Sequence, residues 1–422
     1  MHTVPSQRPA LRVPGDKSIA HRALLLAALA EGTSRLRGVP TGLDVGSTQS
    51  ALRAVGVTIA EVDGGLVVDG CAGLFAAPAA PIDCGNSGTT LRLLCGLLAT
   101  RGVSATLTGD ASLRARPMRR IAEPLAAFGA DVQLSEHGTA PVQVRGNPDA
   151  RGAAVAVRVA SAQVKSAILL AALGAHGHSR ITGALATRDH TERLLPAFGV
   201  PLERAAEGAL VVHGPARLVA TAVDVPGDIS SAAFLLAAAA AAPGARVQIE
   251  DVGLNPTRTA FLGVLRRFGA DIEAEVTSAE DIEPRGRIAV RGAALHAVTI
   301  GPDEVPALID ELPLIGVLGA FACGTTTVRG AAELRVKESD RIAAFADAAR
   351  ALGIEVETFD DGFAVRGLAR FRPAHVATHG DHRIAMAFAA AGRAAGVRVE
   401  LDDPACAAVS FPDFYDVLER VT

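Results

Sequence analysis

The sequence is duplicated on two length scales, and this duplication constrains its fold more than any other feature. Val13-Pro14-Gly15-Asp16 recurs 212 residues later as Val225-Pro226-Gly227-Asp228, and a Leu/Ala-rich helical segment follows each copy. The offset is half of the 422-residue chain, which is longer than a single hydrophobic core usually supports. The sequence therefore predicts two similar domains.

A shorter repeat indicates what each half contains. A glycine between two apolar residues ends a helix-like segment at five places, and successive glycines are separated by 73, 70, 70 and 84 residues. Glycine directly after a helix supplies a left-handed cap before the next strand. The five sites are Val55-Gly56-Val57, Phe128-Gly129-Ala130, Phe198-Gly199-Val200, Phe268-Gly269-Ala270 and Leu352-Gly353-Ile354. This spacing predicts an α/β fold of six units of about 70 residues, in which strands and helices alternate.

We expect the two halves to form two domains with a cleft between them. The N-terminal-half domain is predicted to span 13–225, and the C-terminal-half domain to combine 1–12 with 228–422. Hinges are expected near 12–13 and 224–228. Clefts between domains are favoured places for small-molecule sites, so a candidate site is predicted there.

Composition excludes several classes of partner. A net charge of −4, one tyrosine and no tryptophan argue against a surface for nucleic acid or an anionic membrane. The apolar segment 230–242 is too short to span a bilayer and is predicted to be a buried helix. The N-terminus lacks the plan of a signal peptide, and the five cysteines include no Cys-x-x-Cys pair. We therefore expect a cytoplasmic protein without disulfides or structural zinc.

Lysine is rare in this chain: of 41 basic residues only Lys17, Lys165 and Lys337 are lysines. A lysine among so many arginines is a candidate for a role that arginine cannot fill, since an ammonium is a compact charge with an adjustable pKa. Lys17 and Lys337 lie in dense polar clusters, whereas Lys165 is expected to have a structural or supporting role. The alternative is that the lysines are ordinary solvated side chains.

The two long repeats differ where chemistry is expected. Lys17, His21 and Arg22 of the first copy are replaced in the second by apolar residues, although Pro-Gly-Asp is kept. Asp16 or Ser18 can cap the helix that begins here, and its first turn favours an anion. The added cations therefore indicate function, and the alternative is a capped helix with exposed charges.

Further polar motifs precede predicted helices. The Gly/Ser/Thr loop 85–90 lets backbone N–H groups approach a phosphate or carboxylate, although it is not a P-loop and an ordinary turn is its rival. The segment 114–120 could place one arginine in the cleft. The residues 161–163 and 187–190 could bind a polyol, and 381–383 offer cations at a helix start.

Two acidic positions complete the candidate site. Asp310 and Glu311 lie in an apolar segment, where carboxylates are costly unless they are paired or functional. Lys337 and Arg341 are predicted to share one helical face, with Glu338 beside them. Cations, hydroxyls and acids in one cleft suit substrates that carry phosphates and carboxylates. The histidine and carboxylate spacings give no ligand set for a catalytic metal.

Seven motifs, in order along the chain, carry a resemblance to a known family. They are Asp16-Lys17-Ser18 with His21-Arg22, 85–92, Gly109-Asp110 with Arg116-Pro117-Met118, Ser161-Ala162-Gln163, 254–258, 335–341 and Asp381-His382-Arg383. With these motifs the chain resembles the EPSP synthases, also called 3-phosphoshikimate 1-carboxyvinyltransferases, from about Val13 to Tyr415. The run Arg-Val-Lys-Glu-Ser-Asp-Arg at 335–341 is the most specific of them.

The resemblance implies a fold and a reaction. The fold is two domains, each with three βαβαββ units arranged as an inverse α/β barrel. The reaction moves the enolpyruvyl group of phosphoenolpyruvate to the 5-hydroxyl of shikimate 3-phosphate by addition and elimination of phosphate, in the pathway to aromatic amino acids. No cofactor is implied, and the expected state is a monomer.

The resemblance also implies roles for individual residues. Phosphoenolpyruvate would be bound by Lys17, Gly88, Arg116, Gln163, Arg341, His382 and Arg383. Shikimate 3-phosphate would be bound by Lys17, Ser18, Arg22, Ser161, Ala162, Gln163, Arg188, Asp310 and Lys337. Asp310 would take the hydroxyl proton, Glu338 would protonate and then deprotonate the methylene carbon, and Lys17 would assist phosphate departure.

The chain departs from the family pattern near its C-terminus, where Val409 replaces a lysine that precedes the Phe-Pro motif. Two alternatives stay open. One is the related carboxyvinyltransferase that acts on UDP-N-acetylglucosamine, which uses a mobile-loop cysteine that the segment 112–120 lacks. The other is a non-catalytic phosphometabolite-binding protein, which would gain nothing from Asp310 and Glu338. Glyphosate is expected to compete with phosphoenolpyruvate, because Gly88 leaves room for it.

Overall fold

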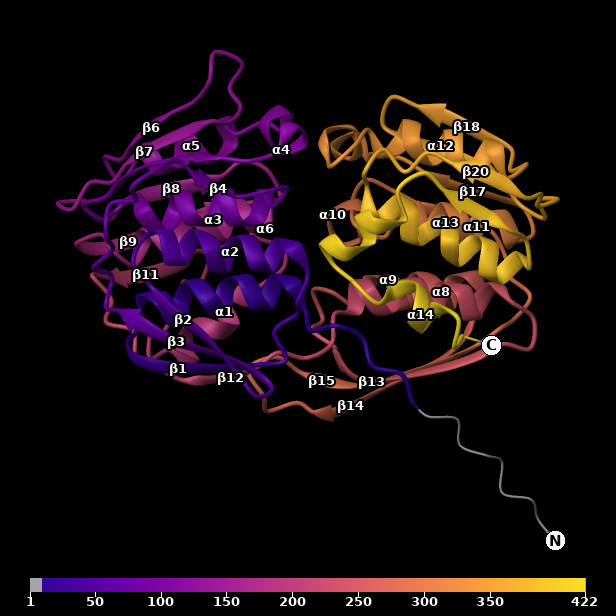
Figure 1. The fold of residues 1–422 in the computed structure, drawn as a ribbon, viewed down its shortest axis with the longest axis horizontal. Helices are drawn as coiled ribbons and strands as arrows, with labels where there is room; N and C mark the ends of the chain where they lie inside the picture. The colour runs from indigo at the N-terminus through magenta and orange to yellow at the C-terminus, as the bar shows by residue number, and fades with distance from the viewer. Residues whose placement is uncertain (1–9, 422) are drawn as a thin grey trace, which may run out of the picture. The chain divides into compact units, whose positions relative to one another are not determined.

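The computed structural model describes residues 10–421, which form two compact units (Figure 1). The N-terminal unit is Asp16–Val225, and the C-terminal unit combines 10–15 with 226–421. Residues 13–15, assigned above to the N-terminal half, lie with the C-terminal unit, where Asp228 N donates to Pro14 O at 2.8 Å. That the two units fold as independent domains stays a prediction. The predicted bounds of the C-terminal-half domain also include 1–9 and 422, which lie outside the described residues.

The N-terminal unit contains three four-stranded sheets of the same topology. Its strands are β1 (Glu31–Arg37), β2 (Thr58–Val62), β3 (Gly65–Cys71), β4 (Ile82–Asp83), β5 (Ser104–Thr108), β6 (Asp131–Gln133), β7 (Val142–Arg145), β8 (Ala154–Val157), β9 (Gly177–Gly183), β10 (Glu203–Arg204), β11 (Leu210–Gly214) and β12 (Ala222–Asp224). The strand orders are β12-β1-β3-β2, β4-β5-β7-β6 and β8-β9-β11-β10. Each sheet has one parallel pair followed by two antiparallel pairs.

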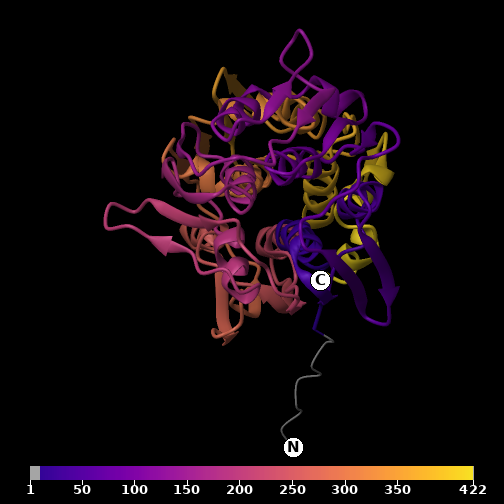
Figure 2. The ribbon, with the colours of Figure 1, turned by 90° about the vertical axis from the view of Figure 1, so that its left-hand side faces the viewer.

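Helices connect these strands in the same order each time. They are α1 (Lys17–Leu29), α2 (Leu43–Ala54), α3 (Gly88–Leu98), α4 (Ala111–Ala115), α5 (Arg119–Ala126), α6 (Ala162–Ala172) and α7 (His190–Ala197). The sequence β4-α3-β5-α5-β6-β7 is one βαβαββ unit, and β8 to β11 with α6 and α7 form another. The remaining unit contains β1, β2 and β3, and its first strand is β12, which lies at the C-terminal end of the N-terminal unit. Figure 2 shows these helices nearly end on, with strands toward the outside.

The C-terminal unit repeats this plan with modifications. Its strands are β13 (Arg246–Gly253), β14 (Asp271–Ser278), β15 (Arg285–Arg291), β16 (Thr299–Ile300), β17 (Thr325–Val328), β18 (Val356–Phe359), β19 (Gly362–Arg366), β20 (Ala374–Val376) and β21 (Val399–Leu401). Its helices are α8 (Ile229–Ala241), α9 (Ala260–Phe268), α10 (Val305–Leu308), α11 (Leu312–Phe321), α12 (Arg341–Ala351), α13 (His382–Ala395) and α14 (Phe414–Leu418), with 3-10 helices η1 (Ala332–Val336) and η2 (Pro404–Val409). The sheets are β13-β15-β14, β16-β17-β19-β18 and β20-β21.

Two of the six repeats are altered. In the first repeat of the C-terminal unit, Leu11 forms a parallel bridge with Ile249 and so takes the place of the first strand. The last repeat stops after β20, α13 and β21, and η2 and α14 follow instead of a second helix and a hairpin. The ring of Phe414 in α14 packs edge-on against Phe234 of α8 at 5.9 Å, so this end of the chain fills the core.

The five predicted glycine caps are confirmed. Each glycine follows the second helix of a repeat and has a positive φ, from 75° to 92°. Because a residue with a Cβ is strained in this conformation, glycine marks these helix ends in the sequence. The sixth repeat has no such glycine because it has no second helix.

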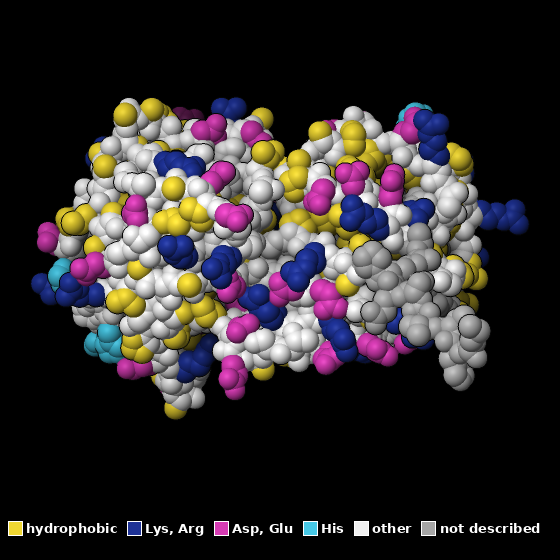
Figure 3. Space-filling model, turned by 60° about the horizontal axis from the view of Figure 1, so that its bottom comes forward, with side chains coloured by type: hydrophobic (Ala, Val, Ile, Leu, Met, Phe, Trp, Pro, Cys, Tyr) yellow, Lys and Arg dark blue, Asp and Glu magenta, His cyan; other side chains and the backbone are white. Residues whose placement is uncertain are grey.

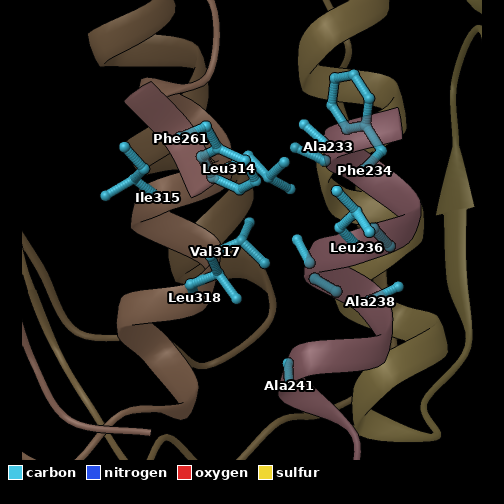
Figure 4. Close-up of a cluster of buried hydrophobic side chains, with 14 of the residues drawn as sticks. Ala233, Phe234, Leu236, Ala238, Ala241, Phe261, Leu314, Ile315, Val317 and Leu318 are labelled. Carbon is cyan, nitrogen blue, oxygen red and sulfur yellow. The ribbon is translucent and has the colours of Figure 1, made fainter. Parts of the chain in front are cut away.

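The core of the C-terminal unit forms around α8, which is buried along its whole length, as predicted for 230–242. Figure 4 shows Phe234 and Leu236 of α8, Leu314 and Val317 of α11 and Phe261 of α9 in one apolar cluster. On the face drawn in Figure 3, basic and acidic side chains are interspersed. No helix between residues 10 and 421 combines the length and the apolar character needed to cross a membrane.

Candidate active site

The candidate residues of the N-terminal unit gather at the N-terminal ends of its helices. α1, α3 and α6 each begin behind a capping side chain, from Asp16, Ser87 and Ser161 respectively. This confirms the prediction that the three motifs open helices. Free N–H groups and the helix dipole make such ends favourable for anions.

Lys17, the first residue of α1, donates to Asp44 Oδ2 at 2.7 Å. Asp44 lies in the first turn of α2, and the two side chains are only 18% and 11% exposed. The pair therefore fixes the position of the Lys17 ammonium. Sequence reasoning missed Asp44 because its partner is 27 residues away, and an acid in the first turn of a predicted helix is an ordinary capping signal.

A chain of buried polar groups joins α1, α2 and α3. His21 Nδ1 lies 2.7 Å from Thr48 Oγ1, which lies 2.6 Å from Thr90 Oγ1. Thr90 in turn donates to Ser87 Oγ at 2.8 Å. Thr48 was missed from the sequence, and Thr90 was included only as a member of the loop 85–90. The chain ties the start of α3, and with it the Gly/Ser/Thr loop, to the helix that carries Lys17.

His21 is a connector in this chain and not a further cation. Burial lowers its pKa well below the ordinary value, and the neighbouring charges of Lys17 and Arg22 lower it further, against a smaller opposite effect of Asp16. A neutral imidazole is therefore favoured at neutral pH. The sequence predicted three added cations in this repeat. With a neutral His21, only Lys17 and Arg22 carry a positive charge here.

Gly88, the first residue of α3, lies against two guanidinium groups. A Cβ at this position would stand 2.6 Å from Arg92 Nη1 and 3.3 Å from Arg116 Nη1. Arg116 is buried, and its Nη2 donates to Asn86 Oδ1 at 2.6 Å. Two cations next to a helix N-terminus form a place for a phosphate or a carboxylate. Arg116 is the buried arginine of the segment 114–120.

Gln163 connects α6 to α3. Arg92 Nη1 donates to Gln163 Oε1 at 2.8 Å, and Gln163 Nε2 donates to Thr89 Oγ1 at 2.9 Å. Gln163 is the second residue of α6, directly after Ala162. The predicted Ser-Ala-Gln motif thus stands beside the loop that precedes α3. Arg92 was quoted within a motif but was not assigned a role from the sequence.

Arg22 connects α1 to α6 and α7. Its Nη1 donates to Ser18 O at 2.8 Å, its Nε to Thr191 Oγ1 at 2.9 Å and its Nη2 to Ser166 Oγ at 2.9 Å. The guanidinium is buried, so these bonds hold it in one orientation. Arg188 lies on the segment between β9 and α7 and is half-buried.

In the C-terminal unit, Arg341 is the centre of the polar cluster. Its Nε donates to Asp381 Oδ2 at 2.8 Å, and its Nη2 contacts Glu338 Oε2. Asp310 Oδ1 lies 3.8 Å from Nη1. Burial opposes the charge, but the three carboxylates, Asp381 first, raise the pKa of Arg341. Asp381 is itself buried, and the guanidinium of Arg341 holds its pKa below the ordinary value.

Arg383 joins a second group of acids to this cluster. Its Nη1 donates to Asp310 O at 3.0 Å and to Ser230 Oγ at 3.3 Å, and Glu311 Oε1 lies 3.8 Å away. Ser230 in turn donates to Glu311. Ser230 was not predicted as a site residue, and Glu311 was singled out from the sequence without a partner or a role, because the contacts of both lie on helices far apart in the sequence. The N-terminal ends of α8, α11 and α13 therefore meet at Arg383.

The prediction that Lys337 and Arg341 share a helical face is wrong. Lys337 follows η1, and Glu338 lies in the turn before α12. The reason is the cap: Asp340 Oδ1 accepts from Ile342 N and Ala343 N, so α12 begins at Arg341. Burial lowers the pKa of Lys337, although Asp310 and Glu333 oppose this effect.

His382 and Val409 complete the predicted positions. His382 is buried as the first residue of α13, directly after its cap Asp381. Val409 is the last residue of η2 and is half-buried. The charge of the family lysine is thus replaced by an apolar side chain at the end of a short helix.

The predicted site residues divide between the two units. Lys17, Ser18, Arg22, Gly88, Arg116, Ser161, Ala162, Gln163 and Arg188 belong to the N-terminal unit, and Asp310, Lys337, Glu338, Arg341, His382 and Arg383 to the C-terminal unit. In the C-terminal unit, ion pairs join Asp310, Glu338, Arg341 and Arg383. In the N-terminal unit, several smaller groups of hydrogen bonds hold Lys17, Arg22, Arg116 and Gln163. In the part of the chain between 10 and 421, no three His, Cys, Asp or Glu side chains are grouped so as to hold a metal ion.

Comparisons with known proteins agree on one family. The family model of EPSP synthase (3-phosphoshikimate 1-carboxyvinyltransferase) matches residues 4–418. The 3-phosphoshikimate 1-carboxyvinyltransferase of Halorhodospira halophila is 48% identical over 413 residues, which cover 97% of this chain and 93% of the relative. That of Thermus thermophilus is 48% identical over 419 residues, which cover 98% of this chain and 96% of the relative.

Solved structures confirm the fold class. The EPSP synthase from Acinetobacter baumannii has a TM-score of 0.84 and 40% identity, and the match covers 97% of this chain and 95% of that one. The enolpyruvyl transferase NikO from Streptomyces tendae is only 19% identical but has a TM-score of 0.78, with 98% and 94% covered. That likeness shows a shared fold.

Proposed function

This chain belongs to the family of EPSP synthases (3-phosphoshikimate 1-carboxyvinyltransferases), and we propose that it transfers the enolpyruvyl group of phosphoenolpyruvate to the 5-hydroxyl of shikimate 3-phosphate. The hydroxyl oxygen adds to C2 of phosphoenolpyruvate while the methylene carbon takes a proton, which gives a tetrahedral intermediate. Loss of a proton from the same carbon and departure of phosphate then give the enolpyruvyl ether and inorganic phosphate.

One observation carries the proposal beyond family membership. Asp310 and Glu338, the two acids to which proton transfers are assigned, both face the guanidinium of Arg341. A cation beside two acids favours their carboxylate forms, which suits Asp310 as acceptor of the hydroxyl proton and Glu338 in the later step, when it removes a proton. The same guanidinium can bind an anionic substrate next to both of them.

Phosphoenolpyruvate carries a phosphate and a carboxylate, and the proposed ligands match these charges. Arg116 stands beside Gly88 at the start of α3, and Arg341 and His382 are the first residues of α12 and α13. Helix N-termini and guanidinium groups both favour anions. The proposed ligands are Lys17, Gly88, Arg116, Gln163, Arg341, His382 and Arg383.

Shikimate 3-phosphate needs cations for its phosphate and polar groups for its hydroxyls. Ser161 caps α6, and Arg22 is held by α6 and α7, so hydroxyl, amide and guanidinium groups are concentrated at these helix ends. The proposed ligands are Lys17, Ser18, Arg22, Ser161, Ala162, Gln163, Arg188, Asp310 and Lys337.

Proton transfers are assigned to the carboxylates and stabilisation of charge to the cations. Asp310 takes the proton of the attacking hydroxyl, and Glu338 gives a proton to the methylene carbon and later removes one. Lys17 stabilises the departing phosphate. Positioned general acids and bases typically contribute a factor of about 10² to 10⁴ in rate, and no metal or cofactor is needed for these steps.

Two alternatives are weaker. A carboxyvinyltransferase for UDP-N-acetylglucosamine would use a mobile-loop cysteine, and the segment 112–120 contains none. A non-catalytic phosphometabolite-binding protein would bind anions without carboxylates at Asp310 and Glu338, because acids weaken anion binding. We further propose that the protein acts as a cytoplasmic monomer, which light scattering after size-exclusion chromatography would test for the oligomeric state.

The variant Glu338→Gln tests the proposal. Glutamine keeps the shape of the side chain and a contact with Arg341 but cannot transfer a proton, so both substrates should bind with affinities within about threefold of wild type while turnover falls by about 10² to 10⁴. Calorimetry and a phosphate-release assay measure the two effects. Glu357→Gln makes the same chemical change on an exposed residue of β18 and should retain full activity. A Glu338→Gln enzyme with wild-type turnover would remove Glu338 from its role.

A further inference from the structure

Lys165, the third lysine, has no role in the proposed reaction, yet it is one of the most buried charged residues in the described chain. It lies in α6, two residues after Gln163, and its side chain is 1% exposed. Its ammonium lies 2.6 Å from Glu192 Oε1 of α7, whose side chain is 4% exposed. Removing two charges from water costs free energy, so such a pair needs further interactions that offset this cost.

The remaining hydrogen bonds of Lys165 go to one segment of backbone. Its Nζ donates to Leu185 O at 3.1 Å and to Thr187 O at 3.3 Å. Both carbonyls lie on the irregular segment 184–189 between β9 and α7. An ammonium has three N–H groups, and the three acceptors account for all of them. Arg188 follows Thr187 directly.

Neighbouring contacts hold the same elements together. Ser166, the residue after Lys165, bonds to Thr191 at 2.8 Å, and Arg22 donates to both. Arg193 Nε donates to Asp189 Oδ1 at 3.0 Å, next to Arg188. Lys165 therefore attaches the middle of the segment 184–189 to α6, and Arg193 attaches the end of the segment to α7.

Lysine suits this position for a geometric reason. The ammonium is a compact group whose three donors diverge, so it can reach a carboxylate and two carbonyls at once. A guanidinium is planar and larger, with five donors in one plane, and does not match three acceptors around a buried point. This explains why a chain rich in arginine has lysine here.

We propose that Lys165 is a positioning residue for shikimate 3-phosphate: it fixes the segment 184–189 so that Arg188 is presented to the substrate. This inference rests on the proposed function, in which Arg188 binds shikimate 3-phosphate. Lys165 does not touch the substrate in this account. Its effect reaches the reaction through the backbone of Leu185 and Thr187, and Glu192 neutralises the ammonium.

The double variant Lys165→Met/Glu192→Met tests the proposal. It removes both charges together and keeps apolar volume, which buried ion pairs often tolerate, but it leaves the two carbonyls without their donor. The KM for shikimate 3-phosphate should rise about tenfold, equivalent to ~1.4 kcal/mol, while the KM for phosphoenolpyruvate stays within about twofold. Backbone amides of 184–189 should exchange hydrogen faster than in wild type.

Arg188→Ala separates positioning from general destabilisation. If Lys165 acts through Arg188, adding Arg188→Ala to the double variant should raise the KM for shikimate 3-phosphate no further than Arg188→Ala alone, because coupled residues are not additive. Leu210→Ala, a core substitution in β11, serves as a control that lowers stability and leaves both KM values unchanged.

The outcomes distinguish this inference from the proposed function. A wild-type enzyme without turnover of shikimate 3-phosphate would contradict the proposed function itself. With an active wild type, an unchanged KM in the folded double variant, effects that add to those of Arg188→Ala, or unchanged hydrogen exchange in 184–189 would each overturn the positioning role.

Discussion

Arg341 and Asp381 form a two-pronged ion pair in the interior of the C-terminal unit, with Nε to Oδ2 at 2.8 Å and Nη2 to Oδ1 at 3.2 Å. The two side chains are 1% and 0% exposed. Arg341 begins α12 and Asp381 caps α13, so the pair locks together two helix ends that carry candidate substrate ligands. Asp381 orients a guanidinium that also contacts Asp310 and Glu338, the two acids to which we assign the proton transfers.

Asp381→Asn should separate charge from capping. Asparagine can still accept from Arg383 N, but the charge opposite Arg341 is lost. Because Arg341 loses its most buried counter-charge and keeps only Glu338 and Asp310, the free energy of unfolding should fall by about 3 kcal/mol, and the KM for phosphoenolpyruvate should rise. Urea unfolding and steady-state kinetics measure these effects.

A surface pair provides the matched control. Glu355 and Arg366 are 3.2 Å apart with side chains 72% and 73% exposed, so Glu355→Gln should change the free energy of unfolding by less than about 1 kcal/mol. Equal stability losses in the two variants would show that the buried pair has no special role.

Gly88→Ala should affect phosphoenolpyruvate selectively. The new Cβ would stand 2.6 Å from Arg92 Nη1, so Arg92 and then Arg116 must move. We expect the KM for phosphoenolpyruvate to rise about tenfold, or ~1.4 kcal/mol, with a smaller change for shikimate 3-phosphate. We expect glyphosate to compete with phosphoenolpyruvate, so its inhibition of the variant should be weaker as well.

Gly263→Ala is the control for this substitution. Gly263 lies inside α9, and a Cβ there meets nothing within 4 Å. Alanine should therefore stabilise the helix by about 0.5–1 kcal/mol and leave the kinetics unchanged. If Gly88→Ala behaves like this control, the place of Arg92 and Arg116 beside Gly88 is not part of the phosphoenolpyruvate site.

His21 should make stability depend on pH. Its pKa in the folded protein is lowered by burial and by Lys17 and Arg22, so the unfolded chain takes up a proton at a higher pH than the folded one. Its contribution is absent above about pH 6.5 and destabilises the fold increasingly as the pH falls below that value, by at most about 1.4 kcal/mol per pH unit.

The variant His21→Gln should flatten this dependence. The free energy of unfolding, measured at pH 7.0 and 5.5, should fall less in the variant than in wild type, even if the variant is less stable at pH 7.0. His375→Gln makes the same substitution at an exposed histidine beside Glu400 and serves as the matched control. A slope that His21→Gln does not reduce would mean that His21 is charged in the folded protein.

Local signals in the sequence predicted much of this fold. Glycine after an apolar residue marked five helix ends, because a left-handed cap depends only on the residue that adopts it. The truncation of the last repeat was not predicted, since it depends on Phe414 packing against Phe234 across the core. The start of α12 was predicted too early because Asp340, and not a residue before Lys337, caps it.

At the candidate site, the helix starts were predictable from the sequence. Asp16, Ser87, Ser161 and Asp381 are capping residues, and capping involves only the next few residues. The ion pairs that hold the charged residues of these motifs were missed. Asp44 with Lys17, Glu192 with Lys165, and Glu311 with Arg383 join elements that only the tertiary fold brings together.

Release of inorganic phosphate tests the central claim most directly. Purified protein is mixed with phosphoenolpyruvate alone, shikimate 3-phosphate alone, both together, and phosphoenolpyruvate with UDP-N-acetylglucosamine. The account predicts phosphate only in the mixture of phosphoenolpyruvate and shikimate 3-phosphate, in amounts equal to the enolpyruvyl ether formed. No phosphate from that mixture, or phosphate released with UDP-N-acetylglucosamine in its place, would contradict it.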